Sequence, residues 1–315
     1  MNGLYAKTTG YSHLYRWMPF VASVVFCLAL TACNRQKVSG GPAYSDKPVT
    51  AQVETRYVFA VHPLQNPQLL HQMYQPLMAY LGRQLGGAEV VLDTSNDYAD
   101  FERKLKDGIP QFALPNPYHA TLARNWGYQV VAKMGNDEVF RGIFIVRNDS
   151  PVKKPEDLKG LVVSYPAPTA LAAAMLPQLY LQNHGVDVEK DITNKYVGTH
   201  NSSIMNAYLG EAAAAATWPV AWNAFQKANP KEASQLHVIW QTPQLIQNAV
   251  IAQHTVPAAV REKVQSLLVE LTQHSEGQQL LAGIDTASFV RASDQDFDVV
   301  STFLEEFNVK VRKQK

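Results

Sequence analysis

Tyr57-Val58-Phe59-Ala60-Val61 begins the part of the chain in which short apolar runs alternate with amphipathic stretches. A short apolar run rich in β-branched and aromatic residues is typical of a strand that is buried on both faces. An amphipathic helix is predicted over residues 67–85, where Asn66 suits the N-cap and Pro67 the first helical position. The next apolar run, Val90-Val91-Leu92, predicts a second strand. A strand, a helix and a strand in this order favour a parallel sheet covered by helices.

The same alternation continues along the chain in two series. The first series has further strands predicted at 111–114 and 128–133 and helices at 98–106 and 118–125. The second has strands predicted at 161–164, 194–197, 212–217 and 237–240 and helices at 170–184, 202–209 and 220–228. Longer β runs at 139–147 and 247–253 join the two series, and two or three helices over 257–307 follow. The strand predicted within Ala212–Ala216 rests on its position alone, because alanine favours helix.

Two such series predict an α/β protein of two Rossmann-like lobes joined by two hinge crossings, near residues 140 and 245. Lobe 1 is predicted to comprise residues 55–140 plus 246–315, and lobe 2 residues 141–245. In open α/β sheets a ligand binds outside the carboxyl ends of the strands, where helix N-termini point. Two lobes place two such edges face to face, so we expect a ligand cleft between them.

The first 32 residues have the pattern of a signal peptide. Residues 1–18 carry two basic residues and no acid, and the apolar run 19–30 is too short for a permanent membrane helix. It ends in Leu30-Thr31-Ala32-Cys33, which resembles a bacterial lipobox. The resemblance implies cleavage before Cys33 and a lipid anchor on its sulfur. The alternative is a conventional signal peptide with Cys33 present by chance. Residues 33–54, rich in Gly, Ser, Pro and Lys, then predict a flexible tether.

Composition excludes several classes of function. Both cysteines, Cys27 and Cys33, fall outside the predicted domain, which therefore needs no disulfide. Removing Lys7 and Arg16 from 28 basic residues leaves 26 against 27 acids, and a near-neutral chain without a basic run argues against nucleic acid as partner. The common nucleophile, phosphate-loop, zinc and dinucleotide motifs are missing, and the nine histidines lack metal-ligand spacing. We therefore expect no enzyme, no cofactor and no metal.

Five blocks of sequence resemble the PhnD-like family of phosphate, phosphite and phosphonate ABC-transporter binding proteins. They are Asn96–Phe101, Gly108–Tyr118, Phe140–Pro151, Pro155–Gly160 and Gly198–Asn201, within a resemblance over about residues 56–300. The resemblance implies the fold of a type 2 periplasmic binding protein. It also implies a small anionic ligand, an ABC permease in the inner membrane as partner, a monomer, and a place on the periplasmic side of a bacterial membrane.

The sequence departs from that family at its ligand site. The family has a Ser-Thr-Ser run at a helix N-terminus, where this chain has Pro166-Ala167-Pro168-Thr169-Ala170, so that only the threonine remains. Acidic residues often found in the stretch that is here Gly210–Trp218 are also missing. These departures affect the identity of the ligand more than the fold.

Two helix starts carry the main candidate ligand-binding residues. Thr169 is predicted to cap the helix that follows it, which would aim the N–H groups of Ala170 and Leu171 at an anion. A plain cap without a ligand is the alternative. His200 and Asn201 open another helix, where the histidine could donate a hydrogen bond to an oxyanion or lie in a surface loop.

Other candidates follow strand ends. Asn116 is first of all a cap, and Tyr118 offers either a phenol to the ligand or only an apolar ring to the core. Arg141 is the predicted charged partner near the crossing strand, with an ordinary surface arginine as the alternative. Three further residues, His62, Thr217 and Trp218, are predicted to line the cleft.

The function predicted from these residues is that of a lipid-anchored solute-binding protein of an ABC importer. Its ligand would be a small oxyanion such as phosphonate, phosphite or phosphate, held between the lobes. One alternative keeps the fold but reports the ligand to a membrane sensor, and another changes the ligand. A third is an enzyme or accessory protein that shares the fold, since fold does not fix function.

Overall fold

The computed structural model describes residues 55–313. The predicted signal peptide, the predicted lipid-bearing Cys33 and the predicted tether over 33–54 lie outside these residues. None of the helices within 55–313 combines the length and apolar character that crossing a membrane requires.

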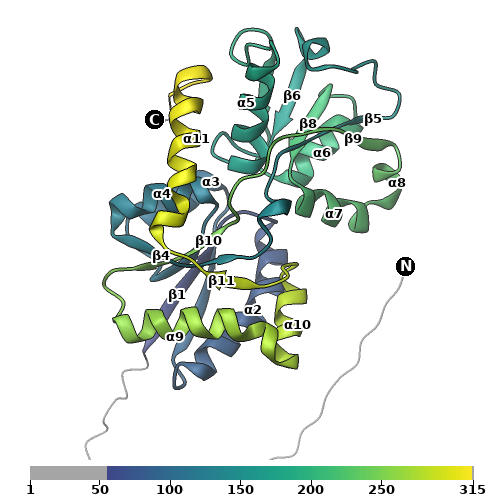
Figure 1. Cartoon of the computed structure of the whole chain (residues 1–315). Coiled ribbons are helices and arrows are strands. Elements are labelled where there is room, and N and C mark those ends of the chain that lie inside the picture. The colour runs from purple at the N-terminus through teal and green to yellow at the C-terminus, as the bar shows by residue number, and fades with distance from the viewer. Residues whose placement is uncertain (1–54, 314–315) are drawn as a thin grey trace, which may run out of the picture. The chain divides into compact units, whose positions relative to one another are not determined.

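Within residues 55–313, the strands form two sheets (Figure 1). The six-stranded sheet has the order β11-β4-β10-β3-β1-β2, and its strands are β1 (Arg56–Val61), β2 (Glu89–Thr94), β3 (Phe112–Leu114), β4 (Tyr128–Met134), β10 (Ala249–Gln253) and β11 (Phe289–Arg291). The five-stranded sheet has the order β7-β6-β8-β5-β9, and its strands are β5 (Ile143–Arg147), β6 (Val162–Tyr165), β7 (Thr193–Tyr196), β8 (Ala214–Thr217) and β9 (Leu236–Gln241). We call the first sheet with its helices lobe 1 and the second lobe 2.

The two sheets repeat one arrangement. The order β2-β1-β3-β10-β4 in lobe 1 corresponds to β7-β6-β8-β5-β9 in lobe 2, with β11 added at one edge of lobe 1. In each lobe the fourth strand of this order, β10 or β5, runs antiparallel to both of its neighbours. The fold class predicted from the sequence is confirmed, but the chain reaches each sheet from the other lobe through an antiparallel strand.

Helices cover both faces of each sheet. Lobe 1 contains α2 (Pro67–Gln84), α3 (Tyr98–Lys106), α4 (Pro117–Ala123), α9 (Ala258–Val269), α10 (Ser275–Gly283) and α11 (Asp298–Lys310). Lobe 2 contains the π-helical segment η4 (Leu171–Met175), which continues into α5 (Leu176–Asn183), and α6 (His200–Tyr208), α7 (Pro219–Ala228) and α8 (Pro230–Ala233). Short 3₁₀ helices lie at Arg124–Trp126, Asp137–Val139, Pro155–Leu158, Glu270–Gln273 and Asp294–Phe297.

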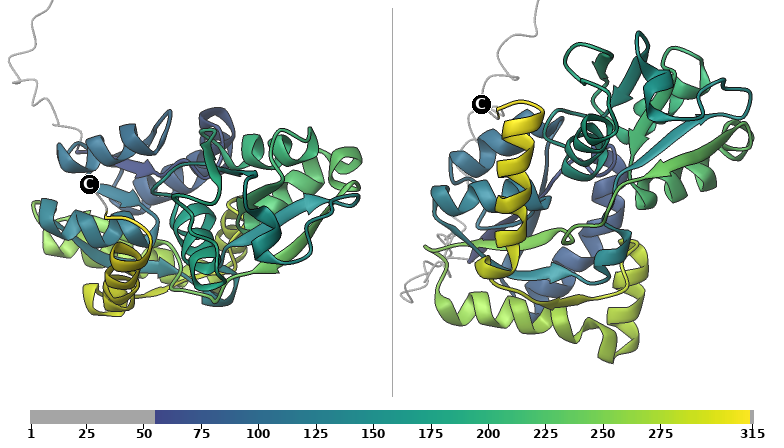
Figure 2. Two further views of the ribbon diagram at one scale, coloured as in Figure 1. Left: turned by 90° about the horizontal axis from the view of Figure 1, so that it is seen from above. Right: turned by 45° about the horizontal axis from the view of Figure 1, so that its top comes forward.

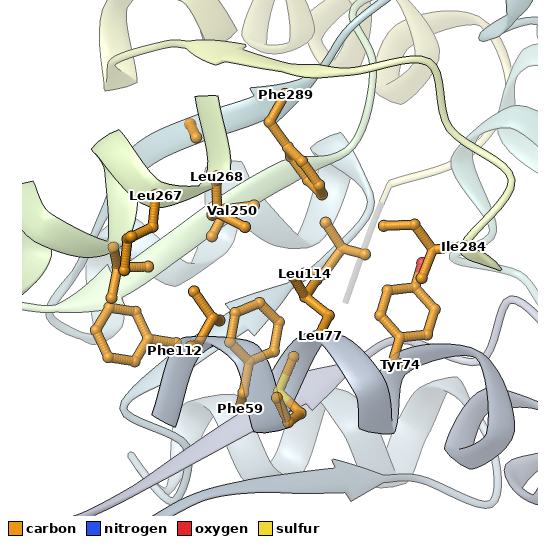
Figure 3. Close-up of a cluster of buried hydrophobic side chains, with 14 of the residues drawn as sticks. Phe59, Tyr74, Leu77, Phe112, Leu114, Val250, Leu267, Leu268, Ile284 and Phe289 are labelled. Atoms are coloured by element: carbon orange, nitrogen blue, oxygen red, sulfur yellow. The ribbon is translucent and has the colours of Figure 1, made fainter. Parts of the chain in front are cut away.

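The alternation of side chains along β1 shows which helices cover each face of the lobe 1 sheet. Phe59 and Val61 belong to the core cluster that also contains residues of α2, α9 and α10, whereas Ala60 belongs to the cluster with residues of α3, α4 and α11. Figure 3 shows Phe59 and Phe112 of the sheet and Leu77 of α2 among the side chains of the first of these clusters. Successive strand residues point to opposite faces, so a strand covered on both sides is apolar throughout.

Several predicted elements differ from those observed. The β run predicted over 139–147 is wrong at its start, because a 3₁₀ helix occupies Asp137–Val139 and the strand begins only at Ile143. The helix predicted over 170–184 begins as a π-helix, since Pro177 has no N–H to donate to the carbonyl four residues before it. Strand β11 was not predicted. The strand at Ala214–Thr217 is confirmed against the helix propensity of its alanines.

The predicted cap of the first helix is confirmed and can be tested by stability. The Asn66 side chain accepts a hydrogen bond from the Leu69 N–H at 2.9 Å. Replacement of Asn66 by Ala is expected to lower the free energy of unfolding by about 1 kcal/mol, measured by urea titration. Asn66→Ser is the control, because serine also caps. An equal loss in both variants would mean that the cap contributes nothing.

Two crossings connect the lobes and are hydrogen-bonded to each other (Figure 2). The Gly142 N–H donates to the Thr242 hydroxyl at 2.9 Å, and the Thr242 N–H donates to the Gly142 carbonyl at the same distance. The Leu245 N–H donates to the Phe140 carbonyl at 2.9 Å. The two connections therefore form one short hinge of paired chains.

Candidate functional site

Among residues 55–313, six helices begin at the carboxyl ends of strands that run parallel to one another in their sheet. In lobe 1, α2, α3 and α4 follow β1, β2 and β3; in lobe 2, η4, α6 and α7 follow β6, β7 and β8. The first N–H groups of a helix have no partner within the helix and carry the positive end of its dipole. The edges from which these helices start therefore present hydrogen-bond donors to the space between the lobes.

A small cavity lies where these edges meet. The space open to the centre of a water molecule is about 10 Å³, which is room for about one water. Both lobes and both crossings contribute to it. Its lining consists of His62, Leu64, Tyr98, Asn116, Phe140, Ala170, Leu171, Ala172, Ala173, His200, Trp218 and Asn248.

A chain of three polar side chains crosses from one lobe to the other at this cavity. The Thr217 hydroxyl lies 3.0 Å from Nδ1 of His200, and Nε2 of His200 lies 3.4 Å from the Tyr98 hydroxyl. The Thr217 side chain is fully buried, so its O–H needs an acceptor, and Nδ1 of His200 is the one within reach. We therefore assign the proton of His200 to Nε2, which donates to the Tyr98 oxygen and leaves the Tyr98 O–H free to donate into the cavity.

His62 contributes a second histidine from lobe 1. It follows β1 directly, and its Nδ1 lies 2.7 Å from the Leu114 carbonyl at the end of β3. Burial lowers the pKa of His62 to about 3, with nearby His119 and His200 adding to the decrease and the Leu114 carbonyl opposing it. The ring is therefore neutral at every pH at which the protein is expected to function.

Asn116 caps α4 and also contacts lobe 2. Its Oδ1 accepts from the His119 N–H at 3.0 Å, as the sequence predicted for a cap, and its Nδ2 donates to the Thr169 carbonyl at 3.0 Å. Behind it, Nε2 of His119 lies 3.4 Å from a carboxylate oxygen of Glu102. Burial lowers the pKa of His119, and Glu102 partly opposes this shift. Asn116 is thus a second polar contact between the lobes.

The start of η4 differs from the prediction. The N-cap is Ala170 and no side chain caps the segment, so the prediction that Thr169 is the cap is wrong. The Ala170 carbonyl instead accepts from the N–H groups of Ala173, Ala174 and Met175. Within residues 55–313, the N–H groups of Leu171 and Ala172 have no such partner, and both residues line the cavity. Main-chain donors are therefore available here without the hydroxyl groups that are missing from the sequence.

The remaining wall of the cavity consists of aromatic rings and an amide side chain. The Trp218 ring lies edge-on to Phe140 with centroids 6.0 Å apart, and Asn248 is fully buried beside them. Among the described residues, the Oδ1 of Asn248 has no hydrogen-bond partner, while its Nδ2 lies 3.8 Å from the Met134 sulfur. An unpaired buried amide oxygen is costly unless something in the cavity donates to it.

The residues proposed from the sequence fall into three groups. His62, Asn116, Ala170, His200 and Trp218 line the cavity. Thr217 and Thr169 contact lining residues from outside it. Asn201, Tyr118 and Arg141 are placed elsewhere.

Those last three residues have other surroundings. Asn201 is exposed and lines a neighbouring pocket between α2 and α7. Tyr118 is buried in the lobe 1 core, where its ring meets His119 edge-on. Arg141 donates to the Glu138 carbonyl and to the Gln241 side chain. The structure does not bring these three side chains to the cavity.

Tyr98 and Asn248 line the cavity but were not proposed as ligand-binding residues from the sequence, whereas the N–H of Leu171, which also lines it, was. Tyr98 had a usable signal, because it is the first residue of a helix that follows a strand, the same pattern that pointed to His200. Asn248 had none, since it precedes a strand that enters the sheet from the other lobe.

The cavity lining carries no formal charge. None of its residues within the described chain is Lys, Arg, Asp or Glu. Burial lowers the pKa of His200 to about 3 and raises that of Tyr98, so both side chains are neutral. Among residues 55–313 there is also no group of three side chains suited to hold a metal ion. An anion in this cavity would be bound by neutral donors and helix dipoles.

Comparison with known proteins gives consistent results. The family described as the periplasmic substrate-binding protein of phosphonate ABC transporters matches residues 59–297. A probable ABC transporter phosphite binding protein, PhnD1 of Prochlorococcus marinus (strain MIT 9301), is 23% identical over 197 residues. That match covers 58% of this chain and 65% of PhnD1, which is just under two thirds of the relative's length.

Two solved structures share the fold. The binding protein component of an ABC phosphonate transporter from Pseudomonas aeruginosa has a TM-score of 0.74 at 17% identity, covering 80% of this chain and 87% of its own. PhnD1 of Prochlorococcus marinus in complex with methylphosphonate has a TM-score of 0.73 at 19% identity, covering 81% and 99%. Because the family match spans more than half of the chain, this protein belongs to the phosphonate family of periplasmic ABC-transporter substrate-binding proteins.

Proposed function

We propose that this protein is an exported, lipid-anchored binding protein that holds a small oxyanion between its lobes and delivers it to an ABC permease. Phosphonate, phosphite and phosphate are the candidate ligands. The lipid would be attached to Cys33, and the protein would remain on the periplasmic side of the membrane.

One observation carries the proposal: donors from both lobes converge on one small, uncharged cavity. The Tyr98 hydroxyl comes from lobe 1, and the N–H groups of Leu171 and Ala172 come from lobe 2. A ligand that contacts both lobes stabilises their closed arrangement relative to an open one. In the present arrangement the cavity has room for about one water, so it must widen by movement of the lobes to admit any of these oxyanions.

Calorimetric titration of the purified protein with phosphate, phosphite and methylphosphonate tests the proposal. We expect at least one of the three to bind with a dissociation constant of about 1 μM or less, equivalent to about −8 kcal/mol. No heat with any of them, from folded and ligand-free protein, would contradict the proposal and turn the search to other small molecules.

Arg312, near the C-terminal end of the described chain, provides a further contact between the lobes. Closure of the lobes would depend on this contact. Arg312 follows α11 of lobe 1 and donates to the Gln178 side chain and the Pro168 carbonyl of lobe 2. Its guanidinium also lies 5.1 Å from the centre of the Phe307 ring. These bonds join the lobes outside the cavity.

Replacement of Arg312 by Ala is expected to weaken oxyanion binding by about 3- to 10-fold without removing any group that touches the ligand. A part-exposed hydrogen bond is worth about 1 kcal/mol, and a smaller closed population lowers the apparent affinity in proportion. Titration calorimetry measures the change, with the exposed neighbour Lys313→Ala as control. Equal affinities of the two variants would show that Arg312 has no part in closure.

A further inference from the structure

The tautomer of His62 can be assigned from its surroundings. A backbone carbonyl is only an acceptor, so the Nδ1 that lies 2.7 Å from the Leu114 oxygen must carry the proton. A neutral imidazole has one N–H, which leaves Nε2 with a lone pair. His62 is buried and lines the cavity. It therefore offers the cavity an acceptor and not a donor.

The ring cannot readily change this role, because burial keeps it neutral. The pKa of His62 is lowered to about 3, and the titratable side chains that face it do not reverse this. The Tyr98 ring of α3 lies edge-on to the His62 ring with centroids 6.1 Å apart, and His119 of α4 and His200 of α6 are close enough to lower its pKa further. Glu102 interacts with His119 and not with His62.

Asn248 supplies a second hydrogen-bond acceptor in addition to Nε2 of His62. Its Oδ1 is buried and has no partner within the described residues. The cavity thus presents two acceptors beside the donors of Tyr98 and η4. A fully deprotonated oxyanion has only acceptor oxygens, so it satisfies the donors and places a negative oxygen against each lone pair. An oxyanion that carries one proton has an O–H to donate.

We propose that His62 makes this site selective for oxyanions that carry a proton on oxygen, such as hydrogen phosphonate or hydrogen phosphite, over their dianions and over sulfonates. The inference rests on the proposed function, because it concerns how the same cavity chooses among oxyanions. Protonated oxyanions donate to Nε2 of His62, whereas a sulfonate of the same shape has no proton to give. The strongest discrimination between similar ligands arises when the wrong ligand leaves a buried polar group of the site without a hydrogen bond.

Methylphosphonate and methanesulfonate form the matched pair of probes, titrated by calorimetry at about pH 5.5 and about pH 9, an interval that includes the loss of the second phosphonate proton. We expect methylphosphonate to bind at least about 10-fold more tightly than methanesulfonate at the lower pH. We also expect its affinity to fall at the higher pH while that of methanesulfonate stays constant. His62, His200 and Tyr98, the titratable side chains that line the cavity, remain neutral at both values, so the change would report the ligand's proton.

His62→Phe removes the lone pair and keeps a ring in place. The Leu114 carbonyl keeps a donor in this variant, because the main-chain N–H of residue 62 also donates to it at 3.2 Å. We expect the variant to bind the two probes with affinities within about 3-fold of each other. If this variant fails to fold, titration of the unaltered protein with the two probes at the two pH values is sufficient to test the proposal.

Two results would overturn the proposal. One is binding of methanesulfonate as tight as that of methylphosphonate at the lower pH. The other is a methylphosphonate affinity that does not change between the two pH values. If the unaltered protein binds neither probe nor phosphite, the proposed function itself fails, and the selectivity proposal fails with it. If methanesulfonate binds as tightly as methylphosphonate, the proposed oxyanion-binding function still stands, and only the selectivity assigned to His62 is contradicted.

Discussion

Replacement of His200 by Phe is expected to weaken oxyanion binding by about 100-fold or more. The substitution breaks the chain from Thr217 through His200 to Tyr98 and leaves the buried Thr217 hydroxyl without its acceptor. The Tyr98 O–H then loses the donor that directs it into the cavity. A hydrogen bond to a charged group is worth about 1.5–3 kcal/mol, and each 1.4 kcal/mol is about tenfold in affinity.

His237→Phe is the matched control for this prediction. His237 also lies in lobe 2, but it is exposed on β9 and its ring contacts Asn148. Calorimetry should find the affinity of this variant unchanged, and circular dichroism should find both variants folded. A folded His200→Phe protein that binds as tightly as the unaltered one would show that the chain of polar groups has no part in recognition.

Replacement of Gly142 by Ala is expected to lower both stability and affinity. A Cβ at this position would lie 2.7 Å from the Ala172 carbonyl oxygen and 2.7 Å from Cγ of Pro177. Neither neighbour is the flexible end of a side chain, so η4 or the hinge must shift. Overpacking of this kind costs about 1–3 kcal/mol, and the displaced segment carries the N–H groups of Leu171 and Ala172. We expect about 10-fold weaker binding as a result.

Gly283→Ala tests whether the effect depends on the hinge. A Cβ on Gly283, at the end of α10, would meet nothing within 4 Å. Urea titration should find its stability within about 0.5 kcal/mol of the unaltered protein. If Gly142→Ala were equally harmless, the close packing of the first crossing against η4 would not hold the site in place.

The sequence was sufficient for the fold because its information is local. Most buried strands are short apolar runs, and two of the helices show their caps in the sequence, at Asn66 and Asn116. The position of β10 and β5 within the sheets was not predictable in the same way. Most of the strands with which they pair, β3, β4, β8 and β9, are far from them in sequence. An apolar run predicts a strand but does not show which strand lies beside it.

The site was predictable where a polar residue follows the end of a strand or begins the next helix. His62, Asn116 and His200 follow this rule. Tyr98 follows it as well, although it was interpreted only as the start of a helix. The cap proposed for Thr169 was wrong because the segment begins one residue later, at Ala170, and opens as a π-helix without a side-chain cap. The acceptor role of His62 depends on the Leu114 carbonyl, 52 residues away in sequence, and becomes visible only once β1 and β3 are paired.

A crystal structure of the protein with methylphosphonate would show whether the oxyanion binds in this cavity. We expect the phosphonate between the lobes, with its oxygens within about 3.2 Å of the Tyr98 hydroxyl, the N–H groups of Leu171 and Ala172, and Nε2 of His62. Phosphonate bound outside this cavity, or a cavity that remains without ligand in crystals grown at saturating methylphosphonate, would contradict it.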